Sequence, residues 1–180
     1  MRVLLVSGST RSGSANTAAL VTAAALAPPG VTTVQYQGLA GLPAFNPDHD
    51  GEALPEPVAE LRQQIAAADA VLFCTPEYAG TLPGSLKNLL DWTVGGGQLY
   101  EKPVAWLNVA AANRGHGAQH TLASVLGYVG AVPVEAACRH IPVDRSALGP
   151  DGTISDPGFT AGVAEIWAEL ARHARQPASG

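Results

Sequence analysis

The chain has 180 residues, a length that predicts one folded domain with a sizeable hydrophobic core. Its 15 acidic residues outnumber its 10 basic residues, and the net charge of −5 argues against duplex DNA or RNA as a partner. Hydrophobic residues make up 47% of the chain and charged residues 14%, a composition that excludes a disordered protein.

Apolar runs alternate with helical patterns along the chain, and this alternation predicts an α/β protein whose parallel sheet is covered by helices on both faces. We expect five strands, at Val3–Val6, Val31–Tyr36, Ala70–Cys74, Val104–Val109 and Val132–Glu135. We expect helices over about Asn16–Ala27 and around four apolar stripes, at Val58–Ile65, Leu86–Val94, Leu122–Val129 and Phe159–Leu170. A single domain then spans residues 1–175, and residues 176–180 form a flexible tail.

The composition of the strands predicts their order in the sheet. The first, third and fourth runs are apolar nearly throughout, as expected for central strands that are covered on both faces. The second run alternates with polar residues, and the fifth contains Pro133, which cannot donate a backbone hydrogen bond. Both features are typical of edge strands, so we expect the order 2-1-3-4-5 of the flavodoxin-like fold.

The two cysteines, Cys74 and Cys138, are too few for a disulfide scaffold and lack the spacing of metal ligands. The first apolar run is too short for a signal peptide, and no other run approaches the length that crosses a bilayer. His116 and His120 are four residues apart, but no third ligand accompanies them, so they do not indicate zinc. We expect a cytoplasmic protein with no bound metal and no membrane association.

Ligands of open parallel sheets bind beyond the carboxyl ends of the strands where the strand order reverses, here between the first and third strands. The segment Ser7–Thr17 follows the first strand and is dense in hydroxyl groups, with one arginine, Arg11. Free backbone amides at a helix start and this guanidinium suit a single phosphate monoester. The alternative is that Ser14 or Asn16 only caps the following helix and the segment is an ordinary turn.

The segment after the third strand, Pro76–Trp92, begins with two prolines and two glycines within nine residues. Such a stiff loop can present backbone amides to the polar edge of a planar ring, while Pro76 and Tyr78 offer flat apolar surface. This combination suits a heteroaromatic cofactor. For Glu77 we expect a loop-fixing or partner-subunit contact, because buried carboxylates usually accept backbone or arginine hydrogen bonds.

These two segments, with Lys102-Pro103 before the fourth strand and the glycine-rich segment 113–117, resemble the NADPH-dependent FMN reductase family, which includes quinone, azo-dye and chromate reductases. The resemblance implies FMN as the cofactor and NADPH or NADH as the co-substrate. It implies FMN phosphate and ribityl contacts from Ser9, Arg11, Ser14, Asn16 and Thr17. It implies contacts to the flavin ring from Pro76, Glu77, Tyr78, Ala79, Gly80, Gly115 and His116. The chain departs from the usual family pattern at Ala79, which replaces an asparagine, and at His116, which replaces a glycine.

On this resemblance we expect an NAD(P)H-dependent oxidoreductase in which the flavin carries the chemistry and no protein side chain is catalytic. A ping-pong cycle would reduce a small acceptor, such as a quinone-like molecule, an azo compound or free flavin. The alternative is a flavodoxin-type electron carrier that binds FMN without NAD(P)H oxidase activity. The resemblance also implies a homodimer or homotetramer, with Trp92 as an interface anchor or, alternatively, as a core residue.

Overall fold

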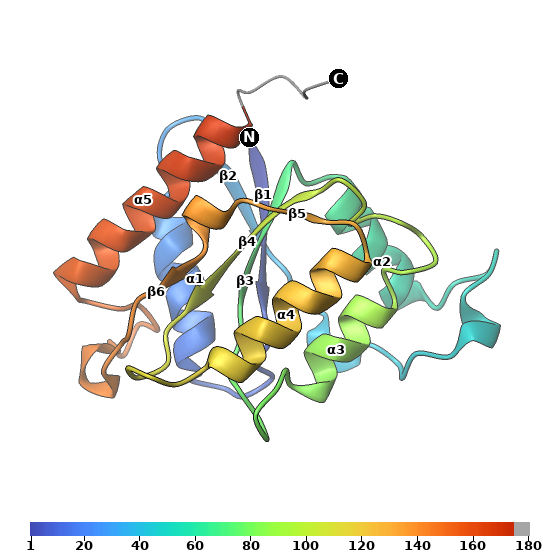
Figure 1. The fold of residues 1–180 in the computed structure, drawn as a ribbon, viewed down its shortest axis with the longest axis horizontal. Coiled ribbons are helices and arrows are strands. Elements are labelled where there is room, and N and C mark those ends of the chain that lie inside the picture. The colour runs from blue at the N-terminus through green and yellow to red at the C-terminus, as the bar shows by residue number, and fades with distance from the viewer. Residues whose placement is uncertain (175–180) are drawn as a thin grey trace.

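A parallel sheet forms the middle layer of residues 1–174, the part of the chain that the computed structural model describes (Figure 1). Its strands are β1 (Arg2–Ser7), β2 (Thr32–Gln35), β3 (Ala70–Cys74), β4 (Pro103–Asn108), β5 (Val132–Pro133) and β6 (Arg139–His140). The order β2-β1-β3-β4-β5 confirms the predicted strand order. The predicted tail, residues 176–180, lies outside the described residues.

The fifth predicted strand is divided into two short segments. β5 and β6 pair with opposite ends of β4, so together they form one edge of the sheet. Val132 and Val134 donate backbone hydrogen bonds toward β4, and Pro133 between them has its nitrogen on the outer side, where no donor is needed. A 3-10 helix at Glu135–Ala137 interrupts the pairing. The edge position is therefore confirmed, although the first segment is shorter than predicted.

Among the described residues, five α-helices cover the sheet, namely α1 (Ala15–Ala25), α2 (Glu56–Ala66), α3 (Gly84–Asp91), α4 (His116–Tyr128) and α5 (Pro157–His173). Helices α1 and α5 pack on one face, and α2, α3 and α4 pack on the other. In β1, Val3 and Leu5 belong to the first core, whereas Leu4 and Val6 belong to the second. The continuous apolar runs thus fill both cores, as central strands of a parallel sheet must.

The end of α3 differs from the sequence prediction. The helix stops at Asp91, so Val94 is not part of its buried stripe and is 61% exposed. Trp92 is fully buried, its indole N–H donates to the Pro43 carbonyl at 2.8 Å, and its ring meets Phe45 edge-on at 5.0 Å. The expectation that Trp92 anchors a subunit interface is therefore wrong, because the ring fills the core of its own chain.

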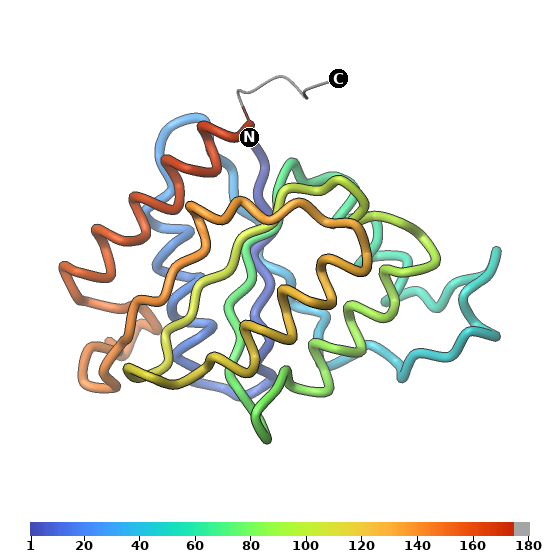
Figure 2. Tube along the Cα trace, in the orientation of Figure 1, coloured from blue at the N-terminus to red at the C-terminus, as the bar shows by residue number. Residues whose placement is uncertain are grey.

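The parallel arrangement brings the loops after β1, β3, β4 and β6 to one edge of the sheet. Figure 2 traces these loops, which gather at the lower edge of the view. Helices α1 and α4 begin at the same edge, with their first backbone N–H groups directed toward it. No helix within residues 1–174 combines the length and apolar character needed to cross a membrane.

Candidate functional site

A cleft of about 920 Å³ opens among the loops at the carboxyl edge of the sheet. Most of the predicted site residues line it, namely Ser9, Arg11, Ser14, Asn16, Pro76, Glu77, Tyr78, Gly115 and His116. Three others, Thr17, Ala79 and Gly80, do not line it. The strand order therefore brings segments that are far apart in the sequence to one site, at the position that the reversal between β1 and β3 predicts.

The first loop presents unpaired donors at the start of α1. The Ser14 hydroxyl accepts the Asn16 N–H at 3.2 Å, so the capping role considered for Ser14 is present. The backbone N–H groups of Ser12, Gly13 and Ala15 have no acceptor within residues 1–174. Free amides at the positive end of a helix dipole, beside the exposed Arg11, match the donor set that a phosphate monoester requires.

Asn16 and Thr17 attach α1 to the ends of the strands beneath the cleft. The Asn16 side-chain oxygen lies 3.4 Å from the Cys74 sulfur, and the Thr17 hydroxyl lies 2.9 Å from that of Ser7. Complete burial raises the pKa of the Cys74 thiol well above its ordinary value. Cys74 is therefore a protonated core residue.

The second loop is a two-residue hairpin turn. Tyr78 and Thr81 exchange two backbone hydrogen bonds, of 3.0 and 3.1 Å, around Ala79 and Gly80. The φ angles of these two residues are 50° and 77°. Two positive φ angles are characteristic of the type I′ turn, for which Asn-Gly is the preferred sequence. The departure from the family pattern at Ala79 therefore concerns the stability of the turn, whose tip is exposed and lies outside the cleft.

Glu77 clamps the second loop to the start of α4. One carboxylate oxygen accepts the backbone N–H groups of Gly117, at 2.7 Å, and Ala118, at 3.1 Å. This is the loop-fixing contact expected for Glu77. A Cβ atom added at Gly117 would lie 2.0 Å from the Gly80 carbonyl oxygen, so a glycine is needed for the two segments to approach this closely.

The third loop is held by Asn108, which ends β4 and is 3% exposed. Its side-chain oxygen accepts the Ala110 N–H, and its amide nitrogen donates to the Arg114 carbonyl, each at 3.0 Å. His116 then begins α4, and its ring meets that of His140 edge-on at 5.9 Å. Within residues 1–174, no three side chains of the types that ligate metals gather into a metal site.

Comparison with known proteins identifies the family. The family model of the NADPH-dependent FMN reductases matches residues 1–144. The chain belongs to this family. An NAD(P)H-dependent FMN reductase of Pseudomonas aeruginosa is 36% identical over 159 residues, 87% of this chain and 85% of that protein. A 2-hydroxy-1,4-benzoquinone reductase of a Burkholderia species is 33% identical over 162 residues, 86% of this chain and 85% of that protein.

A solved structure extends the agreement to the fold. FerB, a flavoenzyme NAD(P)H:(acceptor) oxidoreductase from Paracoccus denitrificans, has a TM-score of 0.83 and 28% identity. The match covers 96% of this chain and 98% of FerB. The resemblance drawn from the sequence and the flavodoxin-like fold are both confirmed. Membership of the NADPH-dependent FMN reductase family favours an enzyme over an electron carrier.

The cleft of this FMN reductase family member contains a fourth segment, which was not among the predicted parts of the site. The loop after β6 contributes Val143, Asp144, Arg145 and Leu148 to the lining. Arg114 of the third loop and Gly117 at the start of α4 also line the cleft and were not predicted. The adjacent charged residues Asp144 and Arg145 were the only feature of the sequence that could have indicated a binding role for this loop, because the loop has no hydrophobic periodicity.

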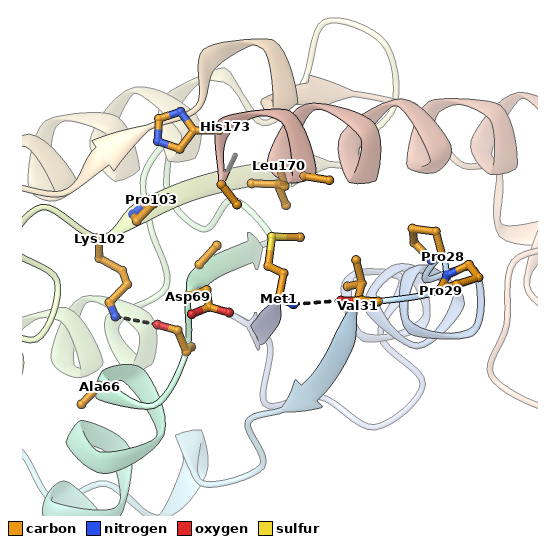
Figure 3. Close-up of a pocket in the computed structure, with 15 residues that line it drawn as sticks. Met1, Pro28, Pro29, Val31, Ala66, Asp69, Lys102, Pro103, Leu170 and His173 are labelled. Atoms are coloured by element: carbon orange, nitrogen blue, oxygen red, sulfur yellow. Dashed lines mark hydrogen bonds between the residues drawn. The ribbon is translucent and has the colours of Figure 1, made fainter. Parts of the chain in front are cut away.

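A second cavity, of about 930 Å³, lies at the opposite edge, among the amino ends of the strands (Figure 3). Its charged groups are engaged within the chain. The Met1 amine donates to a backbone carbonyl at 2.8 Å, the Lys102 ammonium donates to another at 2.5 Å, and Asp69 accepts a backbone N–H at 2.6 Å. The amine, the ammonium and the carboxylate of this cavity therefore each have a backbone partner, unlike the guanidinium groups that line the cleft at the carboxyl edge.

Proposed function

We propose that this protein is an FMN-containing reductase that oxidises NADPH or NADH and reduces small quinone-like acceptors. The observation that supports this function most directly is the first loop of the cleft. Its backbone N–H groups and Arg11 are free to bind an anion, in a chain of the NADPH-dependent FMN reductase family. The single arginine of this loop matches one phosphate group, which favours FMN over FAD.

We assign the two ends of FMN to different loops. The phosphate and ribityl chain are assigned to the first loop and the start of α1, through Ser9, Arg11, Ser14, Asn16 and Thr17. The ring is assigned to the second and third loops, through Pro76, Glu77, Tyr78, Ala79, Gly80, Gly115 and His116. Thr17, Ala79 and Gly80 act by shaping their segments, since these residues do not line the cleft.

FMN held by these loops would supply the chemistry, namely hydride transfer from the nicotinamide and two-electron reduction of the acceptor. The chain supplies position and electrostatics. The Glu77 clamp fixes the second loop against α4 in advance, so the surface offered by Pro76 and Tyr78 needs no rearrangement. The backbone N–H groups of Gly115 and His116 have no acceptor within the described residues, so they can stabilise negative charge at the polar edge of a planar ring.

Flavin analysis and steady-state kinetics test this proposal. The purified protein is expected to retain FMN, and NADPH oxidation is expected to accelerate when 1,4-benzoquinone is added. Double-reciprocal plots at several quinone concentrations should be parallel, because one open face of the ring would serve both substrates in turn. Stoichiometric FAD, or absence of NADPH and NADH oxidation by the FMN-loaded protein, would contradict the proposed function.

We also propose that the chain forms a homodimer or homotetramer. Three large apolar side chains near the ends of α3 and α4 support this, with Val94 61% exposed, Tyr100 65% and Tyr128 91%. Sedimentation velocity at micromolar concentration tests the assembly. The wild-type protein should sediment as a dimer or tetramer and Tyr128→Asp as a smaller species, whereas a monomeric wild type would contradict the proposal.

The state of the cysteines supports a reducing, cytoplasmic compartment, which we propose as the location. Cys74 and Cys138 are both free thiols. Burial raises the pKa of Cys138 to about 11, so this thiol, like Cys74, is protonated near neutral pH and poorly reactive. Cell fractionation tests the location, and recovery of the protein outside the cytoplasmic fraction would contradict it.

A further inference from the structure

The cleft contains more unpaired positive charge than one FMN phosphate uses. Seven arginines lie within residues 1–174, and three of them have a carboxylate within 4.0 Å, namely Arg62, Arg139 and Arg172. Of the other four, Arg11, Arg114 and Arg145 line the cleft. A chain with a net charge of −5 therefore gathers most of the unpaired guanidinium groups of its described residues at one site.

The acidic residues of the cleft form no ion pair with these arginines within the described residues. Glu77 is engaged by the two amides of α4, and Asp144 accepts the backbone N–H and the hydroxyl of Ser146, at 2.8 and 2.6 Å. The bonds from Ser146 hold the pKa of Asp144 below its ordinary value. Within the described residues, the guanidinium groups of Arg114 and Arg145 have neither a hydrogen bond nor a carboxylate within 4.0 Å. Both therefore remain available to a ligand.

Arg114 and Arg145 come from neighbouring loops, apart from the loop that holds Arg11. Arg114 follows β4 and Arg145 follows β6, and two backbone hydrogen bonds, of 2.8 and 3.2 Å, join the bases of these loops. The Asn108 amide fixes the carbonyl of Arg114. The Arg11 loop follows β1, which β3 separates from β4 in the sheet. Both arginines thus belong to the β4–β6 side of the cleft.

Building on the proposed function, we propose that Arg114 and Arg145 bind the 2′-phosphate of NADPH and make this enzyme prefer NADPH to NADH. The 2′-phosphate is a dianionic monoester that NADH lacks, and the planar guanidinium binds phosphate through two parallel hydrogen bonds. Both arginines are exposed and line the cleft. This position suits the adenosine end of a dinucleotide, because the nicotinamide end must reach the flavin ring between the second and third loops.

The first test compares the two nicotinamides with the FMN-loaded protein and 1,4-benzoquinone. In the double variant Arg114→Gln/Arg145→Gln, the ratio of kcat/KM for NADPH to that for NADH should fall about tenfold or more, as expected for losing a hydrogen bond to a charged group. Arg2→Gln is the matched control, since Arg2 is unpaired and exposed but lies outside the cleft. This control should leave the ratio unchanged.

The second test measures binding without turnover. Calorimetry with FMN-loaded protein compares adenosine 2′,5′-bisphosphate with adenosine 5′-monophosphate. The wild type should bind the bisphosphate more tightly, and the double variant should lose that difference while keeping its FMN content.

Three outcomes with the double variant would overturn the 2′-phosphate assignment. They are an equal decrease in kcat/KM for NADPH and for NADH, an unchanged ratio of the two kcat/KM values, and loss of FMN. These outcomes are distinct from failure of the proposed function. In that case the wild-type protein itself would lack FMN or would oxidise neither nicotinamide.

Discussion

Two cavities of nearly equal volume, about 920 and 930 Å³, lie at opposite edges of the sheet and differ in the state of their polar groups. At the amino edge, the charges of Met1, Lys102 and Asp69 are satisfied by backbone partners. At the carboxyl edge, arginines and the first amides of α1 are unpaired. Volume does not distinguish the two. Helices that follow parallel strands begin at the carboxyl edge, so unpaired N–H donors gather there and define the candidate site.

We expect the largest effect from a substitution that removes the cation of the first loop. Arg11→Ala should weaken FMN binding by about 1.5–3 kcal/mol, the range for a hydrogen bond to a charged group. Lys102→Met is the control at the amino edge, where the ammonium binds a backbone carbonyl and should not influence FMN. Titration of the apoprotein with FMN, followed by flavin fluorescence, measures both affinities. Equal losses in the two variants would show that the cavities are not distinguished by their free donors.

The position of the cleft at the carboxyl edge was accessible from the sequence because it follows from strand order. Continuous apolar runs and one edge proline predict the order, and the order determines which loops meet. Residue types in Ser7–Thr17 then predict an anion site without any knowledge of tertiary contacts.

Contacts between distant segments could not be predicted in this way. The burial of Trp92 depends on a loop some 50 residues earlier, through a hydrogen bond to Pro43. The approach of Gly117 to Gly80 depends on the packing of α4. The contribution of Arg145 to the cleft follows from backbone hydrogen bonds that join two loops, which leave no periodic pattern in the sequence.

The second prediction concerns the rigidity of the carboxyl edge. Gly117→Ala places a methyl group against the Gly80 carbonyl, and should destabilise the fold by about 1–3 kcal/mol, as overpacking does. Gly127→Ala, in the same helix but in open space, should instead stabilise it by roughly 0.5–1 kcal/mol, the helix preference of alanine.

Urea unfolding of the two apoproteins gives both free energies. FMN titration should show weaker binding in Gly117→Ala, because the second loop must move. Similar free energies of unfolding for the two variants would contradict the close contact between Gly117 and Gly80.

A smaller effect is expected at the turn of the second loop. Ala79 has a φ of 50°, and an L residue in this region costs roughly 1–2 kcal/mol, less for asparagine. Ala79→Asn should therefore stabilise the protein by about 0.5–1 kcal/mol in thermal or urea unfolding, and Ala79→Val should destabilise it. Equal stability of all three proteins would contradict the type I′ geometry of this turn.

The smallest effect is expected from removing the Tyr78 hydroxyl. Tyr78 is 52% exposed, and its hydroxyl has no hydrogen bond within residues 1–174, so only its ring offers a defined surface to the cleft. Tyr78→Phe keeps that ring and should retain NADPH:quinone turnover within about twofold, whereas Tyr78→Ala removes flat apolar surface and should weaken FMN binding. Flavin content and turnover per bound flavin separate the two effects. Loss of turnover in Tyr78→Phe with FMN still bound would mean that the hydroxyl takes part in proton transfer. In that case the carboxyl edge would supply an acid as well as the unpaired donors that distinguish it from the amino edge.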